Sequence, residues 1–365
     1  MGFHSPHLAS ILHDPQHNRL LRLCFPHEDG PAASLLANRL DAVESLSRDF
    51  AYTIEVLSDD AGIALKDVLG RMVTIELVRG DGSVRHFNGY VFDFKLARTD
   101  GGFAFYNMVL RPWLAYLKLR KDAYLYHGKT LREQTEAVFA EYGAHADWDI
   151  RVVGDDMPMT MACQFGETDH NYLHRRWEAA GWYYWYEHTA TGHKLVLADD
   201  STRAQPIDGP IAEIRFQKHG GSIEEEGIGA WSPARRIVAG RTVLSSFDFK
   251  RPLPATVEVP TIADQGDVLH IETYEYAGAY GFRHRADGNA KGQLRMEEFE
   301  SRCKLQEAEG NNRYALPGRA FTLVDHFHFD PFAPGHDPRK AEFLILSVEH
   351  SAANNYLQGK DAAPD

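Results

Sequence analysis

Two histidines and an aspartate alternate near the C-terminal end of the chain, in the order His326-Phe327-His328-Phe329-Asp330. A strand is expected over Ala320–Phe329, and side chains two residues apart in a strand point to the same face. Both imidazoles and the carboxylate of Asp330 would then share one face, where they could ligate a divalent metal. The pattern is therefore one candidate for the centre of a metal-dependent hydrolase.

This candidate metal site lacks one part of the motif that it is similar to. In the H-x-H-x-D motif of metallo-β-lactamase-like hydrolases a further histidine directly follows the aspartate, whereas Pro331 stands here. The chain also shows no regular alternation of strands and helices suited to that fold. A solvated strand face, with the two phenylalanines on its buried side, is the preferred interpretation. No metal ligand is assigned, and a metal-dependent hydrolase stays open as the alternative.

Two further patterns are similar to ligand-binding motifs but are incomplete. His170 and His174 stand four residues apart on a predicted helix, as zinc-binding helices require, but asparagine replaces the glutamate that a metalloprotease carries directly after the first histidine. His127-Gly128-Lys129-Thr130 is similar to the end of a phosphate-binding loop, but Ala123 replaces the first glycine of that loop. A solvated helix face and a helix cap are the preferred explanations.

Other groupings that could do chemistry also have structural explanations. Adjacent carboxylates such as Asp155-Asp156 and Asp199-Asp200 point to different sides of a strand and are typical of solvated turns. The aromatic run Trp182–Tyr186 could stack on a sugar, but rings in a strand usually pack in a core or an interface. The motifs G-x-S-x-G, H-E-x-x-H and G-x-G-x-x-G do not occur. We expect no catalytic residue and no cofactor.

The composition is that of a globular protein and argues against a nucleic-acid partner. The chain has 365 residues, of which 44% are hydrophobic and 25% charged, and 39 Lys and Arg against 52 Asp and Glu give a formal net charge of −13. A protein that neutralises phosphates normally carries the opposite charge. No apolar run is long enough to span a membrane, and the N-terminus lacks the features of a signal peptide. Folding in the cytoplasm is therefore expected.

The first elements that could position these residues are strands. Residues 1–19 are rich in histidine with little periodicity, and we expect a mobile N-terminal arm there. From residue 20 onward, alternation such as that of Met72–Leu77 and frequent turn residues favour a barrel or sandwich. Strands are expected over Leu20–Phe25, Phe50–Leu57, Arg71–Val78, Val84–Lys95 and Phe103–Arg111.

Helices are expected in two later parts of the chain. Thr130 and Glu133 have the spacing of a capping box, and a glycine follows each of the first two helical patterns. Helices are expected over 131–142, 169–180 and Ala290–Glu309, a hairpin over Trp182–Tyr186 and Lys194–Leu197, and further strands over Arg241–Asp248, Ala255–Val259, Ala320–Phe329 and Glu342–His350. The fold class is therefore mainly β with α insertions.

Several of these segments, in this order, resemble one known family. The chain resembles the N-terminal hub portion of VgrG, the spike protein of type VI secretion systems. Each matching stretch is short, but the ordered set from about residue 20 to residue 357 is specific to the family. The stretches are Leu110–Leu114, Gln164–Asp169, Glu178–Tyr184, Leu195–Asp200, Tyr274–Gly278, the long helix, and Leu316–Leu323.

The resemblance implies a phage baseplate hub with two related β-barrels. The first barrel would span 20–125, a helix and hairpin insertion 126–200, and the second barrel with the long helix 201–365. Three copies would form a ring that adapts a hexameric tube to a threefold needle. The oligonucleotide-binding-fold domain and β-helix needle that follow in the family are absent from this chain, so we expect them on a longer or separate polypeptide.

The resemblance also implies a mechanical role without an active site. The implied partners are two further copies of the chain, the hexameric tube protein Hcp, baseplate components, and a needle that carries a tip protein and effectors. The spike would assemble in the cytoplasm and be ejected by sheath contraction into a target cell. A tail hub of a contractile prophage is the alternative within the same structural class, and a sugar-binding module is an alternative of another class.

Overall fold

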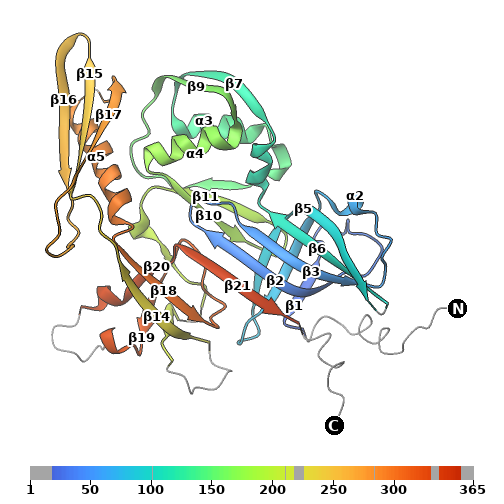
Figure 1. The fold of residues 1–365 in the computed structure, drawn as a ribbon. Helices are drawn as coiled ribbons and strands as arrows, with labels where there is room; N and C mark the ends of the chain where they lie inside the picture. The colour runs from blue at the N-terminus through green and yellow to red at the C-terminus, as the bar shows by residue number, and fades with distance from the viewer. Residues whose placement is uncertain are drawn as a thin grey trace. The chain divides into compact units, whose positions relative to one another are not determined.

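The chain folds into two compact units (Figure 1). The computed structural model describes residues 19–100, 102–209, 211–217, 226–282, 284–329 and 337–354, so nearly all of the expected N-terminal arm lies outside the described residues. Unit 1 comprises Met1–Arg215, Ser222–Glu226 and Asn312–Asp365, and unit 2 comprises Phe216–Gly221 and Gly227–Asn311. The chain therefore leaves unit 1 to build unit 2 and then returns.

A seven-stranded sheet forms the largest part of unit 1. Its strand order is β1-β4-β5-β6-β3-β2-β21, and each neighbouring pair is antiparallel. In β4 the expected face of Val73, Ile75 and Leu77 is buried, but Met72 and Thr74 on the other face are buried as well, so the first half of the strand is covered on both sides. The strands are β1 (Leu21–Cys24), β2 (Leu36–Ser45), β3 (Ala51–Ser58), β4 (Met72–Val78), β5 (Val84–Asp100), β6 (Phe103–Arg111) and β21 (Ser347–Ala353).

The last strand of this sheet comes from the far end of the sequence. β21 pairs with β2 along its whole length, from Ser45 opposite Ser347 to Arg39 opposite Ala353. Residues that the sequence assigns to a second barrel thus complete the first sheet. Strand partners so far apart in sequence leave no local pattern from which the pairing could be read.

Two helices pack together beside a two-stranded sheet in unit 1, as Figure 1 shows. The sheet is formed by β7 (Lys121–Lys129) and β9 (Met159–Thr168), and the helices are α3 (Leu131–Ala140) and α4 (Asp169–Ala180). Thr130 and Glu133 form the expected capping box at the start of α3. Thr168 caps α4, and Gly181 ends it with a φ of 74°, a conformation that glycine adopts without strain. Both predicted helices are confirmed.

Short elements complete unit 1. The expected hairpin is confirmed as β10 and β11, to which β8 adds a parallel strand. A separate four-stranded sheet joins β12, β13 and β20 to β19. The elements are α2 (Leu65–Val68), β8 (Trp148–Ile150), β10 (Tyr183–His188), β11 (His193–Ala198), β12 (Gln205–Pro206), β13 (Glu213–Arg215), β19 (Arg319–Val324), β20 (Glu342–Leu344), and the 3-10 turns Trp113–Lys118, Gly143–His145, Ser201–Arg203, Phe327–Phe329 and Pro338–Ala341.

Unit 2 consists of a three-stranded sheet with one helix against it and a two-stranded ribbon. β15 (Arg241–Asp248) lies between β16 (Arg251–Pro260) and β17 (Glu272–Ala279), and α5 (Arg285–Glu300) packs along β16 and β15. β14 (Ile228–Arg235) pairs with β18 (Lys304–Gly310). Gly288 and Gly292 let α5 approach the sheet, because a Cβ atom at either position would lie 2.9 Å from a valine methyl group of β16.

The second half of the predicted long helix is wrong. We expected one helix over Ala290–Glu309, but α5 begins earlier and ends at Glu300, and residues from Lys304 onward form β18. The apolar positions Leu305 and Ala308 fit either a helix or a strand. Backbone pairing of β18 with β14 decides between them, since pairing with a distant strand overrides a weak local preference.

The fold class is confirmed as mainly β with helical insertions. The strands carry the sheets of both units, and α3, α4 and α5 are the longest helices among the described residues. None of the helices in the described ranges combines the length and the apolar character that crossing a membrane requires.

Candidate functional site: a polar cavity and exposed apolar surfaces

The predicted strand face of His326, His328 and Asp330 is wrong. β19 ends at Val324, His326 follows a left-handed Asp325, and Phe327–Phe329 form a 3-10 turn, while Asp330 lies outside the described residues. The backbone N–H of His328 donates to Nδ1 of His326 at 3.3 Å, which folds the turn back on itself. A strand would have held both imidazoles on one face, and the turn does not.

His170 and His174 form a polar cluster with Asp49, contrary to the expected solvated helix face. The two rings stack with centroids 3.7 Å apart, and Nε2 of His170 lies 3.3 Å from Oδ2 of Asp49. Nε2 of His174 meets the hydroxyl of Tyr184 at 2.8 Å. Across the residues that the structure describes, these three are the only group of three or more His, Cys, Asp or Glu side chains whose ligand atoms lie close enough together to share a metal ion.

Lys118 gives this cluster the character of an ion-pair site. Its ammonium nitrogen lies 2.5 Å from Oδ2 of Asp49. Although burial opposes ionisation, hydrogen bonds from His170 and Lys118 hold the pKa of Asp49 at about 2. Burial and the neighbouring His170 lower the pKa of His174 to about 4, so its ring is neutral at pH 7. The lysine supplies the positive charge that a metal ion would supply.

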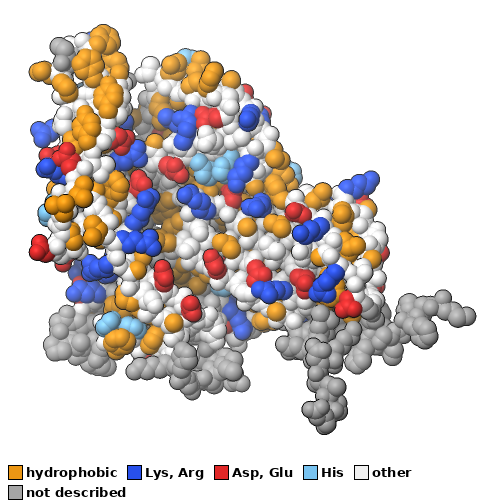
Figure 2. Space-filling view, viewed as in Figure 1, with side chains coloured by type: hydrophobic (Ala, Val, Ile, Leu, Met, Phe, Trp, Pro, Cys, Tyr) orange, Lys and Arg blue, Asp and Glu red, His pale blue; other side chains and the backbone are white. Residues whose placement is uncertain are grey.

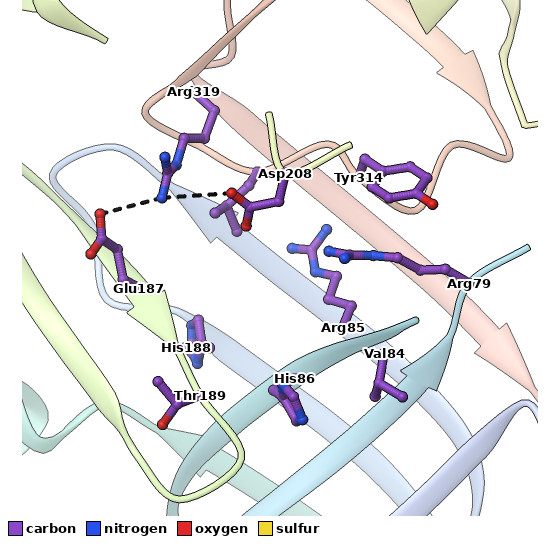
Figure 3. A pocket seen from close by; sticks show the side chains of 11 residues that line it. Arg79, Val84, Arg85, His86, Glu187, His188, Thr189, Asp208, Tyr314 and Arg319 are labelled. Carbon is purple, nitrogen blue, oxygen red and sulfur yellow. Dashed lines mark hydrogen bonds and ion pairs between the residues drawn. The ribbon is translucent and has the colours of Figure 1, made fainter. Parts of the chain in front are cut away.

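A polar cavity of about 300 Å³ lies within unit 1 (Figure 3). The loop between β4 and β5 supplies Arg79, β5 supplies Arg85, and β19 supplies Arg319. Side chains of the β10–β11 hairpin and of the segments before and after unit 2 complete the wall. The lining residues are Arg79, Val84, Arg85, His86, Glu187, His188, Thr189, Asp208, Tyr314, Leu316 and Arg319.

A buried ion pair forms the floor of this cavity. Arg85 pairs with Glu44, and both side chains are almost fully buried. The guanidinium group of Arg85 also donates to the carbonyl of Ala315 and to Nε2 of His350. Removal of one member of such a pair strands a charge in a low-dielectric interior and typically costs about 3–5 kcal/mol. The position of Arg85 is therefore firmly determined.

A chain of hydrogen bonds continues from this ion pair into the core. The hydroxyl of Tyr52 donates to Oε1 of Glu44 at 2.9 Å and lies 3.0 Å from Nε2 of His188. The backbone N–H of Asn88 donates to Nδ1 of His188 at 3.2 Å, so that ring is neutral and carries its proton on Nε2. Burial, with the neighbouring His193 and Arg85, holds the pKa of His188 well below its usual value.

His193 is a second buried neutral histidine in the same network. Its Nε2 accepts the backbone N–H of Trp113 at 2.9 Å, and its Nδ1 lies 2.8 Å from Oδ1 of Asn88. Burial lowers the pKa of His193 to about 3. The network joins β2, β3, β5 and β11. Its polar groups therefore hold these strands in place relative to one another and do not position a reacting atom.

The other predicted chemical groupings have structural roles. Asp156 accepts the backbone N–H groups of Leu131 and Arg132 at the start of α3. Asp199 accepts those of Val153 and Gly154. Of the aromatic run Trp182–Tyr186, every ring except that of Tyr183 is buried, so the run is not an exposed platform for a sugar.

Exposed apolar side chains gather on one surface of each unit (Figure 2). In unit 1 they lie on β7 and β9, where Phe165 is 84% exposed. In unit 2, α5 covers one face of the β16-β15-β17 sheet, and the other face carries Tyr274 and Tyr276, which are 61% and 56% exposed. Large exposed apolar side chains that cluster in this way are typical of protein contact surfaces.

Comparison with known proteins decides the family. Residues 43–356 match the phage tail baseplate hub (GPD) family. The chain belongs to this family. Its hub fold is also that of an Escherichia coli component of the type VI secretion system, described as structurally similar to T4 bacteriophage tail proteins gp27 and gp5, with a TM-score of 0.66 at 16% identity over 92% of this chain and 73% of that one.

Further relatives of the hub come from secretion systems and from prophages. The type VI secretion system spike protein VgrG1b of Pseudomonas aeruginosa is 28% identical over 344 residues, which cover 92% of this chain and 43% of that protein. The 43 kDa tail protein of prophage MuSo2 from Shewanella oneidensis has a TM-score of 0.59 at 17% identity, over 91% of this chain and 94% of that one. The hub chain thus spans less than half the length of VgrG1b.

Sequence reasoning missed the residues of the cavity. Arg79, Arg85, Glu187 and Arg319 come from segments up to 240 positions apart, and of these only Arg319 lies in a stretch singled out from the sequence, Leu316–Leu323. The only local signal is the turn before Arg85, where Asp81-Gly82 stands between two strand patterns. That signal predicts a hairpin, but it does not predict which other segments of the chain lie against the hairpin.

Proposed function

We propose that this chain is the hub at the base of a type VI secretion spike and that it acts as a homotrimer. In this role a threefold ring adapts a hexamer of the tube protein Hcp to the needle and sits among the baseplate components. The alignment with VgrG1b over 92% of this chain carries the proposal. Two related β-barrels, over 20–125 and 201–365, with an insertion over 126–200, are part of the same proposal, except that β21 within the second range completes the sheet of the first.

The proposed role depends on binding energy rather than on a reaction. Hub, tube and needle would assemble in the cytoplasm, and sheath contraction would eject them with the tip protein and effectors into a target cell. The relatives that support this role are named as spike and tail proteins. The buried polar networks of unit 1 suit it, because satisfied internal hydrogen bonds make a rigid part.

The open face of the unit 2 sheet is the surface that we expect to be covered in the ring. Val243, Tyr274 and Tyr276 lie on this face, opposite the face that packs on α5. The charges at one end of the face are already paired, since Arg241 contacts both Glu258 and Glu272. An apolar centre with paired charges at its edge is the usual anatomy of a protein interface.

Deletion of the gene in its own bacterium tests the function. The proposal predicts that tube protein disappears from the culture supernatant while its cellular level is unchanged, and that the gene in trans restores secretion. If instead secretion persists and phage particles are no longer released on prophage induction, the chain is a prophage hub. Unchanged secretion and unchanged phage release would refute both hub roles.

A pair of variants tests the expected contact surface. Tyr276→Glu places a charge on the open face of the sheet and should shift the trimer toward monomer, because a buried unpaired carboxylate opposes association. Gln293→Glu adds the same charge on the exposed side of α5 and should leave the mass unchanged. An equal effect of both substitutions would contradict a specific contact at Tyr276.

A further inference from the structure

The cavity of Figure 3 contains an arginine, Arg79, that forms no ion pair with the acidic side chains that the structure describes. Arg79 has no carboxylate oxygen within ion-pair distance among the described residues, and its guanidinium group lies over the ring of Tyr314, 4.5 Å from the centroid. Burial and the nearby charge of Arg85 lower the pKa of Arg79, which shows that two like charges share this space.

The acidic groups of the cavity are committed to other arginines. Glu44 is paired with Arg85. Glu187 is shared, since Arg151 contacts it at 3.1 Å and Arg319 at 3.3 Å. Asp208 lies 3.9 Å from Arg319, at the limit of an ion pair. Among the described residues no carboxylate therefore forms an ion pair with Arg79, and Asp208 and Asp81 act on its charge only from a greater distance.

The wall also has more hydrogen-bond donors than acceptors. The Nε–H groups of Arg79, Arg85 and Arg319 are all buried and find no acceptor within the described parts of the chain. Buried donors without acceptors are rare and call for an explanation. Three of them line this cavity, which therefore offers unsatisfied donors to an acceptor that enters it.

We propose that this cavity binds an oxyanion of the phosphate class, held by Arg79 with Arg319 and Arg85 as the other positively charged walls. Figure 3 shows Arg79 and Arg319 entering the cavity from different sides. A tetrahedral dianion offers acceptors in several directions and so suits guanidinium groups that converge from different elements, whereas a planar carboxylate is satisfied by one such group. The volume of about 300 Å³ admits a phosphate or a small phosphorylated molecule.

Binding at this cavity would connect segments that are distant in sequence. Arg79 lies at the β4–β5 turn, and Arg319 opens β19 after the chain has returned from unit 2. A bound oxyanion would bridge them, and it would stabilise the folded chain by an amount that grows with the logarithm of its concentration above the dissociation constant. This role is independent of the proposed hub function, because it concerns a ligand within unit 1 alone.

The test uses the whole chain and inorganic phosphate as the probe. Thermal unfolding is followed in chloride buffer of constant ionic strength while phosphate replaces chloride, and the dissociation constant is measured by calorimetry. We expect the melting temperature to rise with phosphate concentration, continuing to rise roughly with its logarithm above the dissociation constant, and no such rise with acetate. Arg79→Gln should weaken phosphate binding by about tenfold or more, Arg79→Lys should weaken it less, and the exposed control Arg48→Gln should bind as the parent does.

The unliganded variant gives a second readout. If Arg79 is uncompensated, Arg79→Gln should melt no lower than the parent in chloride, because the substitution removes a like-charge contact with Arg85. No rise of the melting temperature with phosphate, equal binding by Arg79→Gln and the parent, or equal stabilisation by acetate would each overturn the proposal. A large loss of melting temperature for Arg79→Gln in chloride would show instead that Arg79 has a structural partner.

Discussion

The buried neutral histidines predict that acid destabilises unit 1 in a defined pH window. His193 is only 4% exposed, and its two ring nitrogens are both engaged by hydrogen bonds that require the neutral ring. Burial lowers its pKa to about 3, whereas a histidine in the unfolded chain titrates near its ordinary value of about 6.5. Below pH 6.5 the unfolded chain therefore binds more protons, and the free energy of unfolding falls as the pH falls.

The size of the effect follows from the two pKa values. Between pH 7 and pH 5 the unfolded imidazole goes from about one quarter protonated to almost fully protonated while His193 stays neutral, which costs about 2 kcal/mol. Burial and the charge of Arg85 hold the pKa of His350 near 3 as well, so it adds a similar amount. The pKa of Asp49 is about 2, so its own contribution is lost only below pH 4 and does not enter this window.

Urea unfolding at pH 7, 6 and 5 measures this loss. Tryptophan fluorescence reports on unit 1, because five of the six tryptophans belong to it. His193 and His350 together account for a loss of about 4 kcal/mol between pH 7 and pH 5, and the buried neutral His174 and His188 add to it, so the parent should lose more than that. His193→Gln should lose about 2 kcal/mol less than the parent over the same interval. The exposed control His127→Gln should behave as the parent does. Equal free energies of unfolding at pH 7 and pH 5 would contradict the claim that these buried histidines stay neutral in the folded chain.

Three further predictions concern local packing, capping and assembly. Gly292→Ala adds a Cβ atom 2.9 Å from Cγ2 of Val259, so overpacking should outweigh the gain in helix propensity and cost about 1–2 kcal/mol in denaturant unfolding. The exposed Asn289→Ala in the same helix should stabilise, and a stable Gly292→Ala would contradict the close approach of α5. Thr130→Ala removes the capping box of α3 and should cost about 1 kcal/mol, whereas Lys129→Ala should cost less than about 0.5 kcal/mol; equal effects would argue against the cap. A trimer would carry a formal charge of −39, three times −13. Its population, measured by sedimentation, should therefore rise from low salt to about 0.15 M as salt screens the repulsion between subunits, and a fall would contradict a limit set by that repulsion.

Local rules predicted the parts of the fold that neighbouring residues decide. Thr130 with Glu133, and Thr168 with Gly181, mark helix ends through contacts made within a few residues, and the structure confirms both helices. The strand at β4 and the burial of Val73, Ile75 and Leu77 are confirmed for the same reason, although the burial of Thr74 on the other face could not be predicted from the alternation.

Distant pairing explains what local rules could not predict. Leu305 and Ala308 fit the stripe of a helix, but they pair with β14 as part of β18. The turn at Phe327–Phe329 cancels the strand geometry on which the predicted metal site depended. The cavity forms only because Arg79 and Arg319 come together after the chain has returned from unit 2. No sequence pattern near either residue predicts that they lie close together.

The solution mass of the chain tests the proposed trimeric hub most directly. Light scattering after size exclusion, over a series of concentrations near physiological salt, distinguishes a ring from a single chain. A trimeric hub should appear as a species of 123.6 kDa, three times the 41.2 kDa of one chain. This species should dissociate when Tyr276 is replaced by glutamate. A monomer at every concentration would contradict the claim that these residues build the threefold hub.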